Sequence, residues 1–279
     1  MLRSQVESLY DNPPEHYEEH HFWVFRDFKA ALNHGEIRAA EPDASEKSGW
    51  RVNPWVKKGI LLGFRMGVIA DMSIDVTKQP FFDRATFPVR SMSVSDGVRI
   101  VPGGSSIRDG SYIGRGVICA PPMFINVGAY VGENTMIDSH ALVGSCAQVG
   151  KNCHISAATQ LGGVLEPIGE RPVVIEDDVL VGGNCGVYEG TVVMRRAVLG
   201  TGTILNRSIA VYDLVRDAIY TATETEPLVI PENAVVVPGS RAVNHDLGKK
   251  HGLSLQAAVI VKYRDAKTDT RVQLEDIIR

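Results

Sequence analysis

Asp138 is the side chain in this sequence whose type and position most directly suggest catalysis. It follows Ile137 in a recurring position that is often glycine elsewhere, as at Gly114, Gly132 and Gly144. A carboxylate placed there could accept a proton from a reacting group or orient a cationic one. The alternative is that Asp138 has only a structural role, because aspartate also stabilises exposed turns by accepting hydrogen bonds from nearby backbone N–H groups.

Nucleophilic chemistry through cysteine is not expected. The cysteines show no Cys-x-x-Cys spacing and no disulfide pattern, and no cysteine or serine has a base placed to activate it. We therefore expect no covalent intermediate, and we expect reduced thiols of a cytoplasmic protein. The four cysteines are Cys119, Cys146, Cys153 and Cys185.

Histidine spacing does not favour a metal site. His140 and His154 lie in the central part of the chain, but they occupy different positions of its repeat and no third histidine joins them. His16, His20 and His21 belong to the N-terminal part. Because a catalytic zinc site needs three protein ligands that converge, we expect no metal ion.

An internal repeat of six residues organises the middle of the chain. This period matches neither an α-helix nor simple strand alternation. It fits a solenoid of triangular cross-section, in which each face takes one inward side chain and stacked coils bury a continuous aliphatic column. A sandwich or propeller with chance spacing is the alternative. Chance spacing would rarely put an aliphatic residue at every repeat position except one, which is Cys119. The repeat positions are Val101, Ile107, Ile113, Cys119, Ile125, Val131, Ile137, Val143, Val149, Ile155, Leu161, Ile175, Val181, Val187, Val193, Leu199, Leu205 and Val211.

Three regions follow from this pattern. Residues 1–92 are expected to be helical or mixed, with one helix over about 15–32 and a second that begins at Pro54. Residues 93–242 form the β-helix, which an external loop interrupts at about 162–172, where the repeat slips by two residues. Residues 243–279 cap the open end of the solenoid. The predicted fold class is therefore mainly β, a parallel β-helix with an N-terminal helical region and a short C-terminal cap.

Composition excludes several classes of function. The net charge of −4 gives no general attraction to nucleic acid or to a membrane surface. Apolar runs such as residues 59–62 are far too short to span a bilayer, and the first residues lack the apolar core of a signal peptide. We therefore expect small-molecule substrates, no nucleic-acid or membrane partner, and a cytoplasmic location.

Several segments of the sequence resemble the hexapeptide-repeat family of tetrahydrodipicolinate N-succinyltransferases. The most specific are Gly-Ser-Cys-Ala-Gln at 144–148 and Gly-Gly-Val-Leu-Glu-Pro at 162–167, and similarity extends over about 50–240. The resemblance implies a left-handed β-helix and a homotrimer with active sites between subunits. It also implies lysine biosynthesis, with succinyl-CoA as acyl donor and a ring-opened amino-oxo-dicarboxylate as acceptor. No tightly bound cofactor is implied.

The resemblance also assigns roles to individual residues. Asp138 falls on the family's substrate-binding aspartate, and we expect it to orient the amine and accept its proton. The substrates carry three carboxylates, which calls for bidentate cations. Arg99 matches a substrate-binding arginine, and Arg108 is the next candidate, with an exposed surface role as its alternative.

The sequence departs from the family pattern at Gly186, where many members carry a second acid. Glu189 is the nearest replacement and Glu166 in the loop a weaker one, although Glu189 could be structural. The departure leaves two alternatives open. An altered pocket could take acetyl-CoA in place of succinyl-CoA, or the chain could be a non-catalytic trimeric scaffold.

Coenzyme A carries phosphates that need cations. Arg241, Lys249 and Lys250 cluster after the last coil, near the place where the family binds this co-substrate. We expect them to contact the phosphates, with solvated surface as the alternative.

Overall fold

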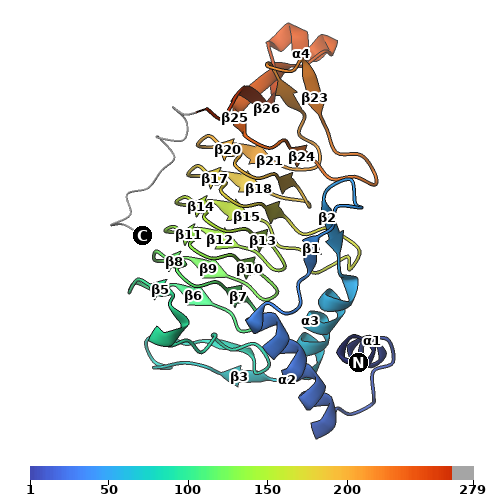
Figure 1. The fold of residues 1–279 in the computed structure, drawn as a ribbon, viewed down its shortest axis with the longest axis vertical. Helices are drawn as coiled ribbons and strands as arrows, with labels where there is room; N and C mark the ends of the chain where they lie inside the picture. The colour runs from blue at the N-terminus through green and yellow to red at the C-terminus, as the bar shows by residue number, and fades with distance from the viewer. Residues whose placement is uncertain (266–279) are drawn as a thin grey trace.

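Three parallel β-sheets form the faces of a triangular solenoid in this computed structural model, which describes residues 1–265 (Figure 1). Successive two-residue strands go to successive faces, and residues eighteen apart are partners, as for Val131 and Val149. The mainly β fold class and the six-residue repeat are therefore confirmed.

Each face is a stack of strands in chain order. Face 1 consists of β7 (Tyr112–Ile113), β10 (Tyr130–Val131), β13 (Gln148–Val149), β16 (Val174–Ile175), β19 (Val192–Val193) and β24 (Val229–Ile230). Face 2 consists of β5 (Arg99–Ile100), β8 (Ile118–Cys119), β11 (Met136–Ile137), β14 (His154–Ile155), β17 (Leu180–Val181), β20 (Val198–Leu199) and β25 (Ala234–Ala242). Face 3 consists of β6 (Ser106–Ile107), β9 (Phe124–Ile125), β12 (Leu142–Val143), β15 (Gln160–Leu161), β18 (Gly186–Val187) and β21 (Ile204–Leu205). We call the corners edge 1–2, edge 2–3 and edge 3–1, after the faces that the chain connects there.

The repeat residues form one buried column along the axis of the solenoid. Ile137, Val143 and Ile155 are completely buried, and they belong to a single apolar cluster that runs from Ile107 to Val236. The second residue of each short strand points inward and the first points outward. The corner residues that follow are therefore the positions from which side chains reach solvent or a ligand.

The repeat differs from its prediction at both ends. Ile100, not Val101, is the partner of Cys119, because the first coil contains one residue more than the others. Val211 does not continue face 1, since Ile230 takes the place beside Val193. The chain leaves the solenoid between these points, and Val211 packs beside Ala258 in the cap instead.

The N-terminal region covers face 1. It contains α1 (Leu2–Asp11), α2 (Glu19–His34), β1 (Ala40–Pro42), β2 (Trp50–Val52), α3 (Pro54–Met66), β3 (Ile69–Asp71), β4 (Phe82–Arg84) and the short 3-10 helix η1 (Val94–Asp96). The two predicted helices correspond to α2 and α3, and Gly35 in the left-handed conformation ends α2. Ala40 and Trp50 pack against Val174 and Val192, so the N-terminal region closes face 1. Within residues 1–265, outward side chains of faces 2 and 3 such as Met136 and Leu142 are only half-buried.

The external loop lies between β15 and β16 and extends at edge 3–1. Val149 pairs with Ile175 rather than with a residue eighteen positions on, because the loop inserts extra residues into this coil. Lys57 of α3 is completely buried and donates a hydrogen bond to the carbonyl of Glu170, and Arg171 donates to the carbonyl of Trp50 at 3.0 Å. The N-terminal region thus holds the loop in place.

The cap is built from two separate segments. β22 (Val211–Asp213) and β23 (Ala218–Tyr220) come from the excursion between β21 and β24, and they join β26 (Ser254–Tyr263), which pairs antiparallel with β25. α4 (Asp246–His251) lies at the tip, the top of Figure 1. β26 lies within the cap that was predicted at 243–279, and the part of that cap at 266–279 lies outside the described residues.

Candidate active site

Asp138 lies at edge 2–3, directly after β11. Its Oδ1 accepts a hydrogen bond from the backbone N–H of Ser139 at 2.7 Å, and its Oδ2 lies 3.8 Å from Nε2 of His154. His154 is the partner of Met136 on the neighbouring strand, so the register of the solenoid creates this contact. One carboxylate oxygen therefore serves the turn, while the other is oriented beside an imidazole and remains available to a proton.

Arg99 lies on the same face as Asp138. It is exposed on β5, and the pairings of Arg99 with Ile118 and of Ile118 with Met136 place it two strands from β11. At about 4.8 Å per strand, its Cα lies roughly 10 Å from that of Met136. Arg99 therefore lies two coils before the strand that leads to Asp138, on the same side of the solenoid.

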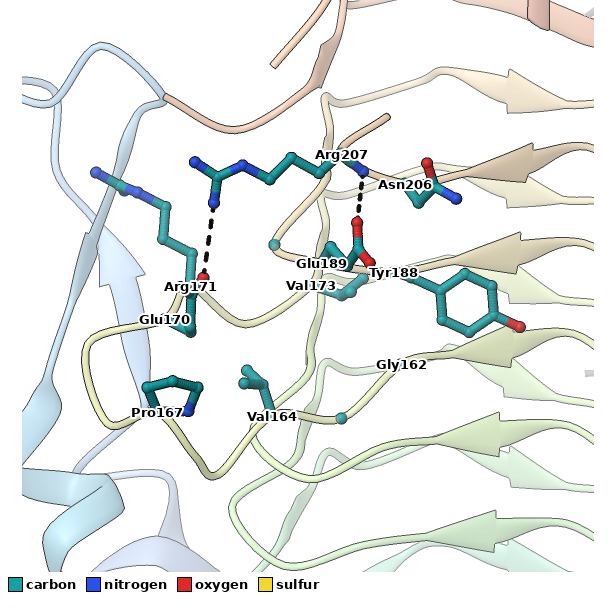
Figure 2. Close-up of a pocket in the computed structure, with 12 residues that line it drawn as sticks. Gly162, Val164, Pro167, Glu170, Arg171, Val173, Tyr188, Glu189, Asn206 and Arg207 are labelled. Carbon is teal, nitrogen blue, oxygen red and sulfur yellow. Dashed lines mark hydrogen bonds and ion pairs between the residues drawn. The ribbon is translucent and has the colours of Figure 1, made fainter. Parts of the chain in front are cut away.

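Glu189 lies at edge 3–1, two residues after the end of β18. It is exposed, it adopts a left-handed conformation with φ of 53°, and its Oε2 accepts the backbone N–H of Arg207 at 2.9 Å. It lines a cavity of about 540 Å³ between this edge and the external loop, where Arg171 and Arg207 extend along one side above Val164 and Pro167 (Figure 2). The cavity is therefore an open, mixed-charge recess that contains one of the predicted acids.

The two arginines of this cavity, Arg171 and Arg207, form hydrogen bonds and ion pairs with other protein groups. The guanidinium of Arg207 donates to the carbonyl of Thr223 at 2.7 Å and lies 3.9 Å from the carboxylate of Glu170. Arg171 donates to Ser48 at 3.2 Å through the same guanidinium nitrogen that contacts Trp50. Both arginines therefore have preferred positions before any ligand enters.

Gly186 is buried under the ring of Tyr188. A Cβ at this position would lie 2.5 Å from Cε2 and 2.9 Å from the hydroxyl oxygen of Tyr188. A larger residue at 186 would have to displace that ring, so the side chains that fit at 186 and 188 depend on each other. Glu166 is exposed elsewhere on the external loop.

Arg108 lies at edge 3–1 beneath the N-terminal region. Its guanidinium contacts the carboxylate of Asp83, donates to Asn126 at 3.3 Å, and lies 5.0 Å from the ring centre of Phe64. These contacts join the N-terminal region to the first coil. Arg108 and Asp138 occupy different edges, so the fold of one chain does not bring them together.

Arg241, Lys249 and Lys250 lie on the hairpin of the cap. Arg241 is on β25, the two lysines are in the last turn of α4, and all three are exposed. Four strand spacings, about 19 Å, separate β11 from β25 along face 2. A ligand that touches both this hairpin and Asp138 must therefore be long.

The two predicted acids lie on different edges of the same solenoid. Asp138 is at edge 2–3 and Glu189 is at edge 3–1, with the whole of face 3 between them. A single reaction centre that contains both acids would need edge 2–3 of one chain and edge 3–1 of another.

Comparisons with known proteins agree with this architecture. Residues 1–66 match a family model described as "Tetrahydrodipicolinate N-succinyltransferase N-terminal", and residues 172–207 match one described as "Hexapeptide repeat of succinyl-transferase". A 2,3,4,5-tetrahydropyridine-2,6-dicarboxylate N-succinyltransferase from Xylella fastidiosa is 39% identical over 254 residues, which cover 89% of this chain and 85% of the relative. The chain belongs to the tetrahydrodipicolinate N-succinyltransferase family.

Other relatives of the same name extend this result. The protein from Polynucleobacter asymbioticus is 39% identical over 89% of this chain and 86% of its own length. The one from Idiomarina loihiensis is 37% identical over 89% of this chain and 85% of its own length. The family models place part of this similarity in the N-terminal region and part in the solenoid.

Two features of this family member were missed from sequence. The contact of His154 with Asp138 had a signal, because His154 is eighteen residues from Met136 and so must lie on the neighbouring strand. Arg171 and Arg207 gave no such signal. Their places depend on the external loop and on the excursion after β21, neither of which follows the repeat.

The thiols of the chain are all free and buried. Burial raises the pKa of Cys119, Cys146 and Cys153 to about 12, from an ordinary value of 9.0, and it also raises that of Cys185. We expect the native protein to resist an aromatic disulfide reagent at mildly alkaline pH and all four thiols to react after denaturation in guanidinium. Fast labelling of any thiol in the native protein would contradict this placement.

The same shifts have a consequence for stability. The folded state holds these protons more tightly than the unfolded state, so their contribution is complete below about pH 9 and is lost as the pH rises towards 12. The free energy of unfolding, measured by chemical denaturation, should fall over this alkaline range.

Two further findings concern metals and membranes. Among residues 1–265, no three histidine, cysteine, aspartate or glutamate side chains converge as a metal site would require. Within the same residues, no helix is long and apolar enough to cross a membrane.

Proposed function

We propose that this protein transfers a succinyl group from succinyl-CoA to the amine of ring-opened tetrahydrodipicolinate, in the diaminopimelate route to lysine. The observation that carries the proposal is the identity of 39% to relatives of that name over 89% of the chain. The N-terminal match is important here, because the hexapeptide repeat alone occurs in many acyltransferases.

The chemistry assigns a proton acceptor to Asp138. The neutral amine attacks the thioester carbonyl, a C–N bond forms, and the C–S bond breaks to release the coenzyme A thiolate. The amine proton passes to Asp138, and a proton returns to the leaving thiolate, so the exchange balances. His154 lies beside this carboxylate, with its Nε2 3.8 Å from Oδ2 of Asp138.

Arg99 is proposed to bind a substrate carboxylate. It is exposed on the face that carries Asp138, and a guanidinium can bind a carboxylate through two parallel hydrogen bonds. Arg108 remains a weaker candidate, because Asp83 and Asn126 already occupy its guanidinium.

We propose a homotrimer of left-handed β-helices with each active site between two subunits. Two features support this arrangement. Asp138 and Glu189 lie on different edges, and the open faces 2 and 3 carry half-buried apolar side chains at outward positions, among them Met136, Leu142, Leu180 and Val198. Packing such a face against a second copy would bury apolar surface and bring the two acids together.

Coenzyme A is proposed to lie along edge 2–3, with its phosphates at the hairpin of the cap. Arg241, Lys249 and Lys250 supply exposed positive charge there. The distance of about 19 Å from β11 to β25 suits a co-substrate with a long flexible arm between its phosphates and its thioester. A cytoplasmic location fits the four unpaired thiols.

A thiol-release assay tests the function. Purified protein with tetrahydrodipicolinate should release coenzyme A from succinyl-CoA faster than from acetyl-CoA. A preference for acetyl-CoA would overturn the donor assignment and point to the departure at Gly186, beneath the ring of Tyr188, as its cause. Release with neither donor would overturn the proposal and favour a scaffold.

A further inference from the structure

A second cavity lies at edge 1–2, the edge that carries neither predicted acid. It measures about 340 Å³ and forms where β1 and β2 of the N-terminal region rest on face 1. Its walls combine aromatic, cationic and acidic side chains, among them Arg38, Trp50, Tyr130, Glu176 and Asp177.

Arg38 projects a pre-oriented guanidinium into this cavity. The guanidinium carbon lies 3.6 Å from the ring centre of Tyr130 and 5.4 Å from that of Trp50, and Nε donates to Gln148 at 2.9 Å. Within residues 1–265 no acceptor engages its two terminal nitrogens. Burial lowers the pKa of Arg38, and nearby groups that include Asp177 act against that shift. A flat, stacked guanidinium with both terminal nitrogens available is the geometry that binds a carboxylate through two hydrogen bonds.

Asp177 supplies the opposite charge. Its Oδ1 accepts the backbone N–H of Lys151 at 2.8 Å, while Oδ2 has no donor among the described residues. The neighbouring carboxylate of Glu176 differs, because one oxygen accepts from the Trp50 indole at 2.9 Å and the other from the Arg195 backbone at 2.8 Å. Asp177 is therefore the acid of this cavity that retains an oxygen for a ligand.

The remaining cations of the wall already have partners. Lys151 is paired with Glu133 at 3.0 Å, and Arg195 lies 3.8 Å from Glu232. The side chains of Lys151 and Arg195 are both more than half exposed, so these ion pairs are weak, but each cation still lies beside its acidic partner. Arg38 and Asp177 are thus one positive and one negative group that line the same cavity and interact electrostatically.

We propose that this cavity binds a free α-amino acid as its zwitterion, with the carboxylate on Arg38, the ammonium on Asp177, and the side chain beside Trp50. A simple anion would satisfy Arg38 but face the charge of Asp177, and a simple cation would meet the reverse conflict. The site lies on a different edge from Asp138 and Glu189 and is independent of the acyl transfer.

Calorimetric titration of the purified full-length protein tests this proposal. The probes are L-alanine, L-lysine and L-glutamate, with acetate and methylammonium as ligands that carry one charge each. We expect at least one amino acid to bind once per chain, and each single-charge ligand to bind at least about tenfold more weakly.

Matched variants assign the binding to the cavity. Arg38→Lys removes the planar guanidinium that can donate two parallel hydrogen bonds. Asp177→Asn removes the negative charge, while the amide oxygen of the asparagine can still accept the backbone N–H of Lys151. Each variant should weaken binding about tenfold or more. Arg51→Lys changes an exposed arginine paired with Glu41 outside the cavity, and Asp138→Asn changes the proposed catalytic acid. Neither should alter the affinity.

Three results would overturn the proposal. The first is that none of the amino acids binds, and the second is that acetate binds as tightly as they do. The third is that Asp138→Asn abolishes binding while Asp177→Asn leaves it intact, which would place the ligand in the acyl-acceptor site. If Arg38→Lys fails to fold, the comparison between Asp177→Asn and Arg51→Lys decides the question.

Discussion

Replacing Asp138 with asparagine should lower kcat by roughly 10²–10⁴-fold, the usual contribution of a general base. Asparagine has nearly the same shape, and its amide oxygen can accept the Ser139 N–H that now binds Oδ1. What it cannot do is take a proton from the amine. The measurement is steady-state coenzyme A release at saturating donor and acceptor.

A matched control separates loss of chemistry from loss of structure. Asp27→Asn removes one exposed carboxylate from α2, far in the fold from edge 2–3, and should leave kcat and oligomeric state unchanged. Asp138→Asn should elute from a sizing column with the wild-type volume. Near-normal turnover in a correctly assembled Asp138→Asn variant would show that another group takes the proton.

Mixed trimers of two inactive variants should regain activity. Asp138→Asn and Glu189→Gln each damage one edge, and the active site is proposed to combine edge 2–3 of one subunit with edge 3–1 of the next. In a cyclic trimer that contains both variants, one of the three sites receives an intact Asp138 and an intact Glu189. Such trimers should show about a third of wild-type activity.

Co-expression with two different affinity tags supplies the material for this test. Sequential purification on both tags isolates particles that contain both variants, and doubly tagged Asp138→Asn trimers serve as the control without complementation. Full inactivity of the mixed particles would mean that the two acids do not act in a shared site. Failure to recover any doubly tagged particle would argue against the oligomer itself.

Local periodicity explains what could be predicted about the solenoid. An inward aliphatic such as Val149 has the same environment in every coil, so the residue type recurs at a fixed interval and the strand positions can be read from it. Helices α2 and α3 were predictable for a similar reason, because Gly35 and Pro54 mark their ends by backbone geometry alone.

The ends of the repeat show where such reasoning stops. Val101 and Ile100 are adjacent aliphatic residues, and only the pairing with Cys119 decides which one takes the repeat position. Val211 matches the period but packs in the cap, since a strand from a distant segment offers it an alternative buried place. Periodicity describes the environment of a residue and does not distinguish two buried environments of similar polarity.

The sequence by itself determined the family, the stacked coils and the placement of Asp138 at a corner. The spacing of the repeat also implied that His154 lies on the neighbouring strand. Only the tertiary structure showed that Glu189 lies on another edge and that Asp83 engages Arg108. It also revealed the cavity of Arg38 and Asp177, whose residues are far apart in the chain. The physical reason is that edges and cavities form from irregular loops and from the docking of the N-terminal region, and their contacts depend on long-range packing that no local pattern encodes.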